Sequence, residues 1–288
     1  MWHESLFVSD CAEDFLCVSI ADKPDIEAST YCLEPRVAVE MNAIRELPFF
    51  RSVNKLVLLP GELSEPCTPY LRDCPAAELK IDYYTDVIDD YTIDISAMQQ
   101  LRYVFSRSLY GFCNVKQATH LKAIKVGQWN EPDFLYLKGA NLAAIQILSG
   151  KIQDMSGIQQ LRNLQFLSVA NCPRIKDFSM LGECVKLESL ILESCGTSIA
   201  TTMPVISSLK YLNLRTASIP DAAWFDRFPN LSYLVLDTRI ADGQINRLQR
   251  LKHCVLITDR QHYSLRNNDL PKSGTVLPND SYHYELNG

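Results

Sequence analysis

Hydrophobic residues recur along this chain in a repeated frame. Residues 207–220, SSLKYLNLRTASIP, and residues 229–242, PNLSYLVLDTRIAD, both contain the pattern Leu-x-Tyr-Leu-x-Leu. The frame starts at Leu209 in the first segment and at Leu231 in the second, so the offset is 22 residues (231 − 209). Alternation of apolar and polar residues within the frame predicts a short β-strand with one buried face.

The same frame can be followed over most of the chain. Ten copies begin at Val53, Ala76, Leu101, Leu121, Leu142, Leu164, Leu187, Leu209, Leu231 and Leu251, and an irregular eleventh lies at Val37 and Val39. Successive copies start 20–25 residues apart. One copy cannot bury its own apolar face, so the copies are expected to stack, with their strands parallel in a shared sheet.

The segments that connect the strands are short. About fifteen residues remain in each copy for the return, which is too few for a long helix with its loops. We therefore expect 3₁₀ turns and single helical turns, and residues 158–164 and 221–229 are typical of such returns.

This pattern resembles the leucine-rich repeat family, whose signature is L-x-x-L-x-L-x-x-N/C-x-L with a period of 20–29 residues. The resemblance covers about residues 33–258. It implies an α/β leucine-rich repeat solenoid, with a curved parallel sheet on the concave side and short helices or 3₁₀ turns on the convex side. The chain departs from the signature at the ninth position, which holds Cys172 and Cys195 in two copies but Trp129, Gly150, Ala217 and Arg239 in others.

The ends of the chain do not follow the frame. Residues 1–32 are expected to form an N-terminal cap, in which residues 15–20, FLCVSI, could be a strand. Residues 33–258 form the predicted solenoid of ten to eleven repeats. The polar residues 259–288, which contain Pro, Gly and Asn, are expected to form a C-terminal cap and a loose tail.

The frame also predicts which side chains face a partner. We number the positions of each copy from its first residue, for example Leu209. Positions four and six point into the core, so positions three, five and seven should be exposed on the concave face. These positions give the following predicted partner-binding residues: Tyr103, Phe105, Arg107, Phe166, Glu193, Tyr211, Asn213, Arg215, Tyr233 and Asp237. Large aromatic residues flanked by charges are typical of binding hot spots. Alternatively, aromatic residues on adjacent strands stack and stabilise the sheet.

A second candidate contact is the acidic, tyrosine-rich segment 80–94, KIDYYTDVIDDYTID. Its residues Asp86, Asp89 and Asp90 could steer a basic protein partner. Calcium binding is another alternative for this segment, although it lacks the pattern of a calcium-binding loop. It could also be a solvated insertion on the convex side.

Composition narrows the class of protein. The chain has 288 residues, 47% hydrophobic and 22% charged, as in a folded soluble protein. Its net charge of −6 argues against nucleic-acid binding. No apolar run is long enough to span a membrane, and the N-terminal residues do not form a secretory signal, so we expect a cytoplasmic protein with no membrane contact. The ten cysteines have no paired spacing, so we expect reduced, mostly buried thiols and neither a metal site nor a cofactor.

These observations favour a binding protein without enzymatic activity. The sequence contains none of the common phosphate-binding, nucleophile-elbow or zinc-hydrolase motifs. The most specific hypothesis is an intracellular inhibitor that occupies its partner on the concave face, such as a bacterial toxin-neutralising immunity protein. The alternatives are an adaptor, scaffold or substrate-recognition subunit, or an enzyme with its site at the cap or tail. The sequence does not indicate an oligomeric state.

Overall fold

The computed structural model describes residues 15–20, 36–39, 41–46, 50–60, 68–81, 92–257 and 275–277. These residues belong to two compact units, which we describe separately. The first unit is Met1–Trp129 with Gly139–Ile145, and the second is Asn130–Lys138 with Gln146–Gly288. No helix in the described ranges is both long and apolar enough to cross a membrane.

The first unit contains a parallel sheet in the strand order β2-β1-β3-β4-β6-β8. Its strands are β1 (Phe15–Ile20), β2 (Arg36–Val39), β3 (Lys55–Pro60), β4 (Glu78–Ile81), β6 (Tyr103–Ser106) and β8 (Ala123–Val126). The fourth positions of the frame are in register across these strands. Leu56 lies opposite Leu79, Leu79 opposite Val104, and Val104 opposite Ile124. The predicted stacking of repeats is therefore confirmed here.

Strand β1 lies out of sequence order. It pairs with both β2 and β3, and its residues Leu16 and Val18 are opposite Leu56 and Leu58. The strand expected at residues 15–20 therefore exists, and it joins the same ladder as the repeats. The division of the chain into caps and solenoid remains a prediction.

The second unit continues the frame in the strand order β10-β11-β12-β13-β14-β15, again parallel. Its strands are β10 (Phe166–Ala170), β11 (Ser189–Glu193), β12 (Tyr211–Ile219), β13 (Tyr233–Ile240), β14 (His253–Ile257) and β15 (Thr275–Leu277). Strand β9 (Ala144–Ile147) has residues in both units. The fourth positions, Leu167, Leu190, Leu212, Leu234 and Cys254, are all in register and buried.

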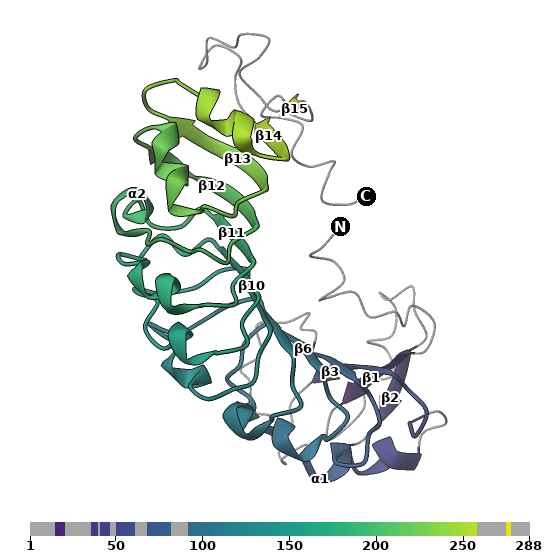
Figure 1. The fold of residues 1–288 in the computed structure, drawn as a ribbon. Helices are drawn as coiled ribbons and strands as arrows, with labels where there is room; N and C mark the ends of the chain where they lie inside the picture. The colour runs from purple at the N-terminus through teal and green to yellow at the C-terminus, as the bar shows by residue number, and fades with distance from the viewer. Residues whose placement is uncertain are drawn as a thin grey trace. The chain divides into compact units, whose positions relative to one another are not determined.

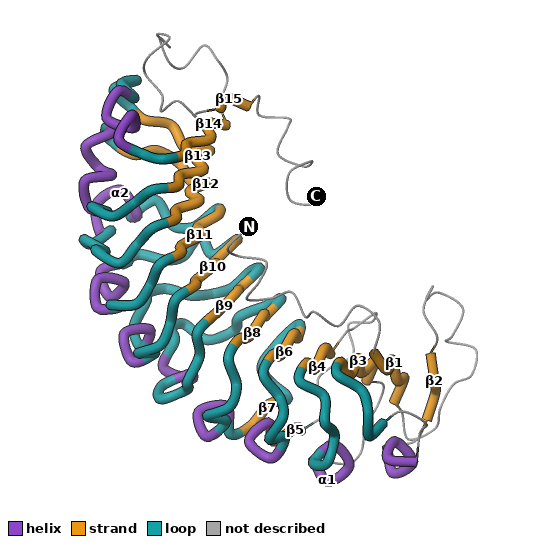
Figure 2. Tube along the Cα trace, turned by 45° about the vertical axis from the view of Figure 1, so that its right-hand side comes forward, coloured by secondary structure: helices purple, strands orange, loops and turns teal. Residues whose placement is uncertain are grey.

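Short helical turns form the returns, on the side of each unit away from the strands (Figures 1 and 2). In the first unit these are η3 (Met41–Glu46), α1 (Thr68–Leu71), η4 (Ile95–Ala97) and η5 (Val115–Gln117), with a small second sheet of β5 (Ile93–Asp94) and β7 (Phe112–Cys113). In the second unit they are η6 (Leu135–Leu137), η7 (Ile158–Gln160), η8 (Ser179–Glu183), α2 (Ile199–Thr202), η9 (Ala222–Arg227) and η10 (Asn246–Arg250). The two helical returns predicted from the sequence correspond to η7 and η9.

Aspartate side chains organise many of these returns. In five repeats an Asp oxygen accepts a hydrogen bond of 2.8–3.0 Å from the backbone N–H two residues later: Asp94, Asp133, Asp154, Asp177 and Asp242. Asp221 instead accepts from the N–H of Trp224 at 3.0 Å and caps η9. Such contacts satisfy donors at the start of a helical turn. The sequence analysis did not predict these contacts, which precede six of the ten copies of the frame.

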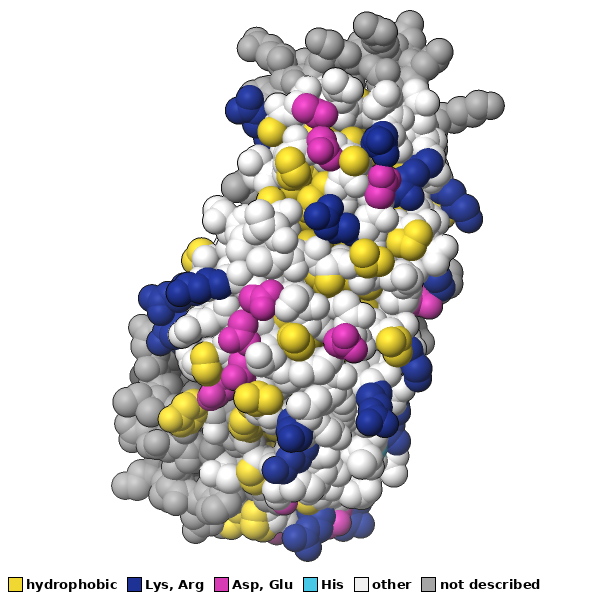
Figure 3. All heavy atoms as spheres, turned by 60° about the vertical axis from the view of Figure 1, so that its left-hand side comes forward, with side chains coloured by type: hydrophobic (Ala, Val, Ile, Leu, Met, Phe, Trp, Pro, Cys, Tyr) yellow, Lys and Arg dark blue, Asp and Glu magenta, His cyan; other side chains and the backbone are white. Residues whose placement is uncertain are grey.

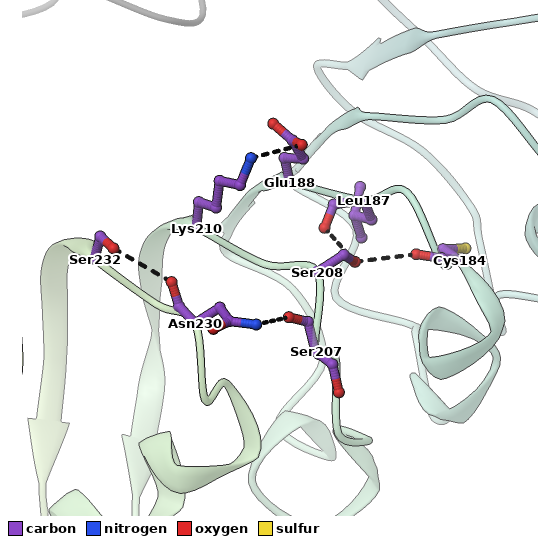
Figure 4. Close-up of polar contacts among 8 residues, drawn as sticks. All are labelled: Cys184, Leu187, Glu188, Ser207, Ser208, Lys210, Asn230 and Ser232. Carbon is purple, nitrogen blue, oxygen red and sulfur yellow. Dashed lines mark hydrogen bonds and ion pairs between the residues drawn. The ribbon is translucent and has the colours of Figure 1, made fainter.

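The turns that lead into the strands are tied between repeats by polar side chains (Figure 4). The Asn230 side-chain amide donates to the Ser207 carbonyl at 2.8 Å, and Ser208 Oγ donates to the Leu187 carbonyl at 2.8 Å. Asn141 repeats the Asn230 contact in the first unit, donating to the Thr119 carbonyl at 2.9 Å. Carbonyls that point out of one turn are thus satisfied by the next repeat.

The two ninth-position cysteines form hydrogen bonds with backbone carbonyls. The Cys195 thiol donates to the Val169 carbonyl of the preceding repeat at 3.3 Å, and the Cys172 thiol donates to the Ala170 carbonyl at 3.3 Å. Trp129, which occupies the same position in another repeat, is only 2% exposed. A buried indole therefore replaces the small polar side chain there.

Candidate protein-binding face

The second unit brings many of the predicted binding residues into adjacent rows. We use "sheet face" for the side of each sheet opposite the buried fourth and sixth positions. At position three, Ser189, Tyr211, Tyr233 and His253 lie opposite one another on β11 to β14. At position seven, Glu193, Arg215 and Asp237 form a second row. Residues that are 22 positions apart in sequence are thus neighbours on one face.

The charged row is held together by ion pairs. Arg215 Nη1 lies 3.0 Å from Glu193 Oε1, and Arg215 Nε lies 2.9 Å from Asp237 Oδ2. Partial burial raises the pKa of Asp237, while the Arg215 guanidinium acts in the opposite direction. The three side chains remain partly exposed, so each pair contributes about 1 kcal/mol or less to stability.

The tyrosine row keeps part of its surface accessible. Tyr233 is 43% exposed, and Tyr211 and His253 are half-buried. The Tyr233 and His253 rings have centroids 6.2 Å apart at an interplanar angle of 44°. This tilted contact leaves ring surface of Tyr233 available to another molecule.

The expected exposure of odd positions is wrong at two of the predicted residues. Phe166 is only 2% exposed and Asn213 only 7%. The side chain next to Phe166 in its row, Ser189, is also buried. Alternation decides which side of a strand a residue occupies, whereas its exposure depends on the surrounding structure. The binding role of Phe166 and Asn213 remains a prediction.

In the first unit, the predicted residues Tyr103, Phe105 and Arg107 come from β6 and the residue after it. Tyr103 and Phe105 are half-buried, and Arg107 is exposed. Phe105 lies between Lys80 on β4 and Lys125 on β8. The two lysines occupy the fifth position of the frame, as Phe105 does, and were not among the predicted site residues.

The remaining predicted residues, Asp86, Asp89 and Asp90, lie outside the described residues. Within the described part of the chain, no cluster of three or more His, Cys, Asp or Glu side chains could hold a metal ion. The described cysteines Cys74, Cys113, Cys172, Cys184, Cys195 and Cys254 are free thiols, and all but Cys113 are buried. Burial raises the pKa of Cys172, Cys184, Cys195 and Cys254 to about 12, which disfavours the nucleophilic thiolate at neutral pH.

Comparison with known proteins agrees with this architecture. The sequence matches no family model, and it matches no curated protein. Among solved structures, the chain is similar to an internalin (InlF) from Listeria monocytogenes, with 14% identity and a TM-score of 0.50 over 84% of this chain and 77% of that one. Internalin C2 of the same organism aligns at 17% identity over 72% of this chain and 73% of that one, with a TM-score of only 0.31. With its in-register parallel strands and short helical returns, this chain is a leucine-rich repeat solenoid.

Proposed function

We propose that this chain is a protein-binding module that contacts its partner through the sheet face. The observation that carries the proposal is the pair of rows on β11 to β14, in which aromatic side chains at position three run beside charged side chains at position seven. Tyrosine offers a large contact area together with a hydroxyl group that can form a hydrogen bond. Tyrosine and arginine are enriched among the residues that dominate binding energy.

The backbone that presents these rows favours recognition. Each strand is hydrogen-bonded to its neighbours, and its inward side chains are almost fully buried, as at Leu212 and Leu234. A surface ordered before binding loses little conformational entropy on association. The rows therefore suit a partner that covers several strands at once.

The proposal is tested by recovering partners from the native host and measuring affinity by calorimetry. We expect the double variant Tyr211→Ala/Tyr233→Ala to weaken binding at least about tenfold, or 1.4 kcal/mol. The matched control is Tyr110→Ala/Tyr136→Ala, because both tyrosines are exposed in return segments. Equal affinity of the two double variants would refute the assignment of the partner site to this face.

A narrower form of the proposal is that binding inhibits the partner, as an immunity protein does to a toxin. The supporting observation is the ordered sheet face of β11 to β14, a surface suited to covering an active site. The test is to titrate the chain into an activity assay of the recovered partner. Loss of activity at one equivalent supports inhibition, whereas full activity of the complex supports an adaptor, scaffold or substrate-recognition role. The acidic segment 80–94 remains a second candidate contact, one suited to a basic partner.

A further inference from the structure

Strand β12 contains a β-bulge directly after its residue in the charged row. The register with β13 shifts by one between Arg215 and Ser218, so that residues 216 and 217 lie opposite Thr238 alone. Bulges are rare between parallel strands, and they often re-aim a side chain. The side chain next to this bulge is that of Arg215, the centre of the charged row.

The residue at position eight accounts for the bulge. In the two preceding repeats this position holds Asn171 and Ser194, which both have a φ of 50°. Their N–H groups donate to the carbonyls of Glu193 and Arg215 in the next repeat, at 2.9 Å and 2.7 Å. Thr216 holds the same position in the next copy. A β-branched residue is strongly disfavoured at positive φ, and Thr216 remains in the extended strand β12.

Thr238 supplies a hydrogen-bond acceptor in place of the backbone carbonyl used by the preceding repeats. The Thr216 N–H donates to Thr238 Oγ1 at 3.1 Å. The same hydroxyl donates to the Leu214 carbonyl at 3.1 Å, and Thr238 is only 6% exposed. One hydroxyl therefore holds the two peptide groups on either side of Arg215. Because peptide groups are planar, holding both of them fixes the backbone dihedrals of Arg215 and the direction in which its side chain leaves the strand.

The bulge also carries a cost in stability. Thr216 Oγ1 is buried, and within the described part of the chain it has no hydrogen-bond partner. A buried oxygen without a partner lowers stability, and such a group in a native protein requires an explanation. A bulge that aims Arg215 at two carboxylates provides one.

Charge alone does not make the charged row unusual. Acidic and basic side chains are also interspersed on the face shown in Figure 3. The charged row differs because its central guanidinium contacts a carboxylate on each side, at 3.0 Å on Glu193 and 2.9 Å on Asp237. The bulge and Thr238 therefore maintain the geometry of the row.

We propose that Thr238 is a positioning residue for partner binding, because its buried hydroxyl holds Arg215 between Glu193 and Asp237 before the partner arrives. This inference rests on the proposed protein-binding function and identifies a buried residue on which that function depends. A side chain that is ordered before binding loses less conformational entropy on association. A fixed row of charges also favours a partner whose own charges are complementary to it.

The positioning is tested first without a partner, by NMR on the full chain. Thr238→Val keeps a β-branched side chain but removes the hydroxyl. Burial raises the Asp237 pKa and the Arg215 guanidinium opposes this rise. When Arg215 is no longer held in place, the Asp237 pKa should therefore rise toward its value in Arg215→Met. Thr238→Ser keeps the hydroxyl and should leave this pKa unchanged.

Thr202→Val is the matched control. Thr202 Oγ1 also accepts from one backbone N–H, that of Phe178 at 3.1 Å, and donates to one carbonyl, that of Ser198 at 3.0 Å. Thr202 ends α2, on the side of the unit away from the strands (Figure 1). Thr202→Val should therefore destabilise the chain to a similar degree in urea unfolding without changing the Asp237 pKa.

The effect on binding is measured by calorimetry with the protein that the full chain recovers from the native host. We expect Thr238→Val to weaken this binding at least about fivefold and Thr202→Val to weaken it less than about twofold. In the Arg215→Met background, Thr238→Val should change affinity less than about twofold, because the two substitutions act through the same side chain.

Several outcomes would overturn the inference. An unchanged Asp237 pKa in Thr238→Val, or an equal change in Thr202→Val, would do so without any partner, and so would full affinity of Thr238→Val for the host protein. If Thr238→Val does not fold, hydrogen exchange in the unmodified chain decides. The Thr216 N–H should exchange within about tenfold of the rate of the Ser194 N–H, and faster exchange would refute the contact with Thr238.

The proposed function fails on a different result. It fails when the tyrosine double variant binds the host protein as tightly as the control double variant does. The NMR comparison of Thr238→Val with Thr202→Val needs no partner, so it gives its answer whether or not the tyrosines contribute to binding.

Discussion

Arg215 Nε lies 2.9 Å from Asp237 Oδ2 across β12 and β13. The two residues are at the same position of consecutive repeats and lie opposite each other in the sheet. Arg215 also reaches Glu193 on β11, so one guanidinium joins three successive repeats. A charge pattern that repeats at the period of the frame thus becomes a cross-strand network on the sheet face.

Removing this guanidinium should make stability more sensitive to pH. Partial burial raises the Asp237 pKa and Arg215 counteracts it, so Arg215→Met should raise that pKa further. An acid with a raised folded-state pKa favours folding at low pH, and this contribution is lost as the pH rises through the folded pKa. We therefore expect Arg215→Met to cost about 1 kcal/mol near pH 7 and less once Asp237 is protonated.

NMR titration of the Asp237 carboxyl and urea unfolding at several pH values would check both expectations. Arg247→Met is the control, because Arg247 pairs with Asp226 where both side chains are more than half exposed. That variant should change stability by less than about 0.5 kcal/mol. A cost of Arg215→Met that grows as the pH falls would contradict the ion-pair explanation.

The close approach of two repeats at Gly196 should make a side chain there costly. A Cβ at this position would lie 1.8 Å from the Ile175 carbonyl oxygen, which also accepts a hydrogen bond from Ser198 Oγ at 2.9 Å. Since neither backbone can move without disturbing its ladder, Gly196→Ala should lower the free energy of unfolding by about 3 kcal/mol.

Gly139→Ala provides the comparison for Gly196. Gly139 has open space around it and a φ of +87°, so only the backbone conformation opposes alanine. We expect a cost of about 1 kcal/mol, measured by urea unfolding followed by circular dichroism. Equal costs at the two glycines would show that the repeats can separate near Ile175.

The aspartate cap of η9 should contribute to stability through its hydrogen bond. Asp221 accepts from the Trp224 N–H, and Trp224 packs edge-on against Phe225 and Phe228 in the core of this return. Asp221→Ala should lower the free energy of unfolding by about 1 kcal/mol. Asp221→Asn should keep most of this stabilisation, because an Asn side chain can also accept the capping hydrogen bond. Asp226→Ala, an exposed acid in the same return, should cost less than about 0.5 kcal/mol. If the Asn and Ala variants at 221 were equally unstable, charge rather than capping would be responsible.

Thiol reactivity should follow burial. Burial raises the pKa of Cys172 and Cys195 to about 12, and both thiols donate to backbone carbonyls. Cys113 is only half-buried. At pH 8, iodoacetamide should modify Cys113 at least about tenfold faster than Cys172 or Cys195, as read by peptide mass spectrometry. The difference should vanish in denaturant, and its absence in the folded protein would contradict the burial of these thiols.

Much of the fold could be predicted because the repeat is a local signal. Leu212 and Leu214 alternate within one strand, and their copies recur near a constant interval, so both the strand and its parallel neighbours follow from the pattern. The aspartate contacts recur in only part of the repeats, so their pattern is weaker than that of the leucines. The position of β1 between β2 and β3 could not be predicted from the sequence, because no local periodicity indicates which strands a segment pairs with.

The sequence alone determined the period, the buried leucine rows and the side of each strand on which Tyr211, Tyr233 and Arg215 lie. These properties depend on alternation along a few residues and on burying apolar side chains between repeats. Only the tertiary structure decided that Phe166 is buried while Tyr233 is partly exposed, and that Arg215 joins Glu193 and Asp237. Exposure and ion pairing depend on what surrounds each side chain after the chain has folded, and those neighbours come from residues more than twenty positions away.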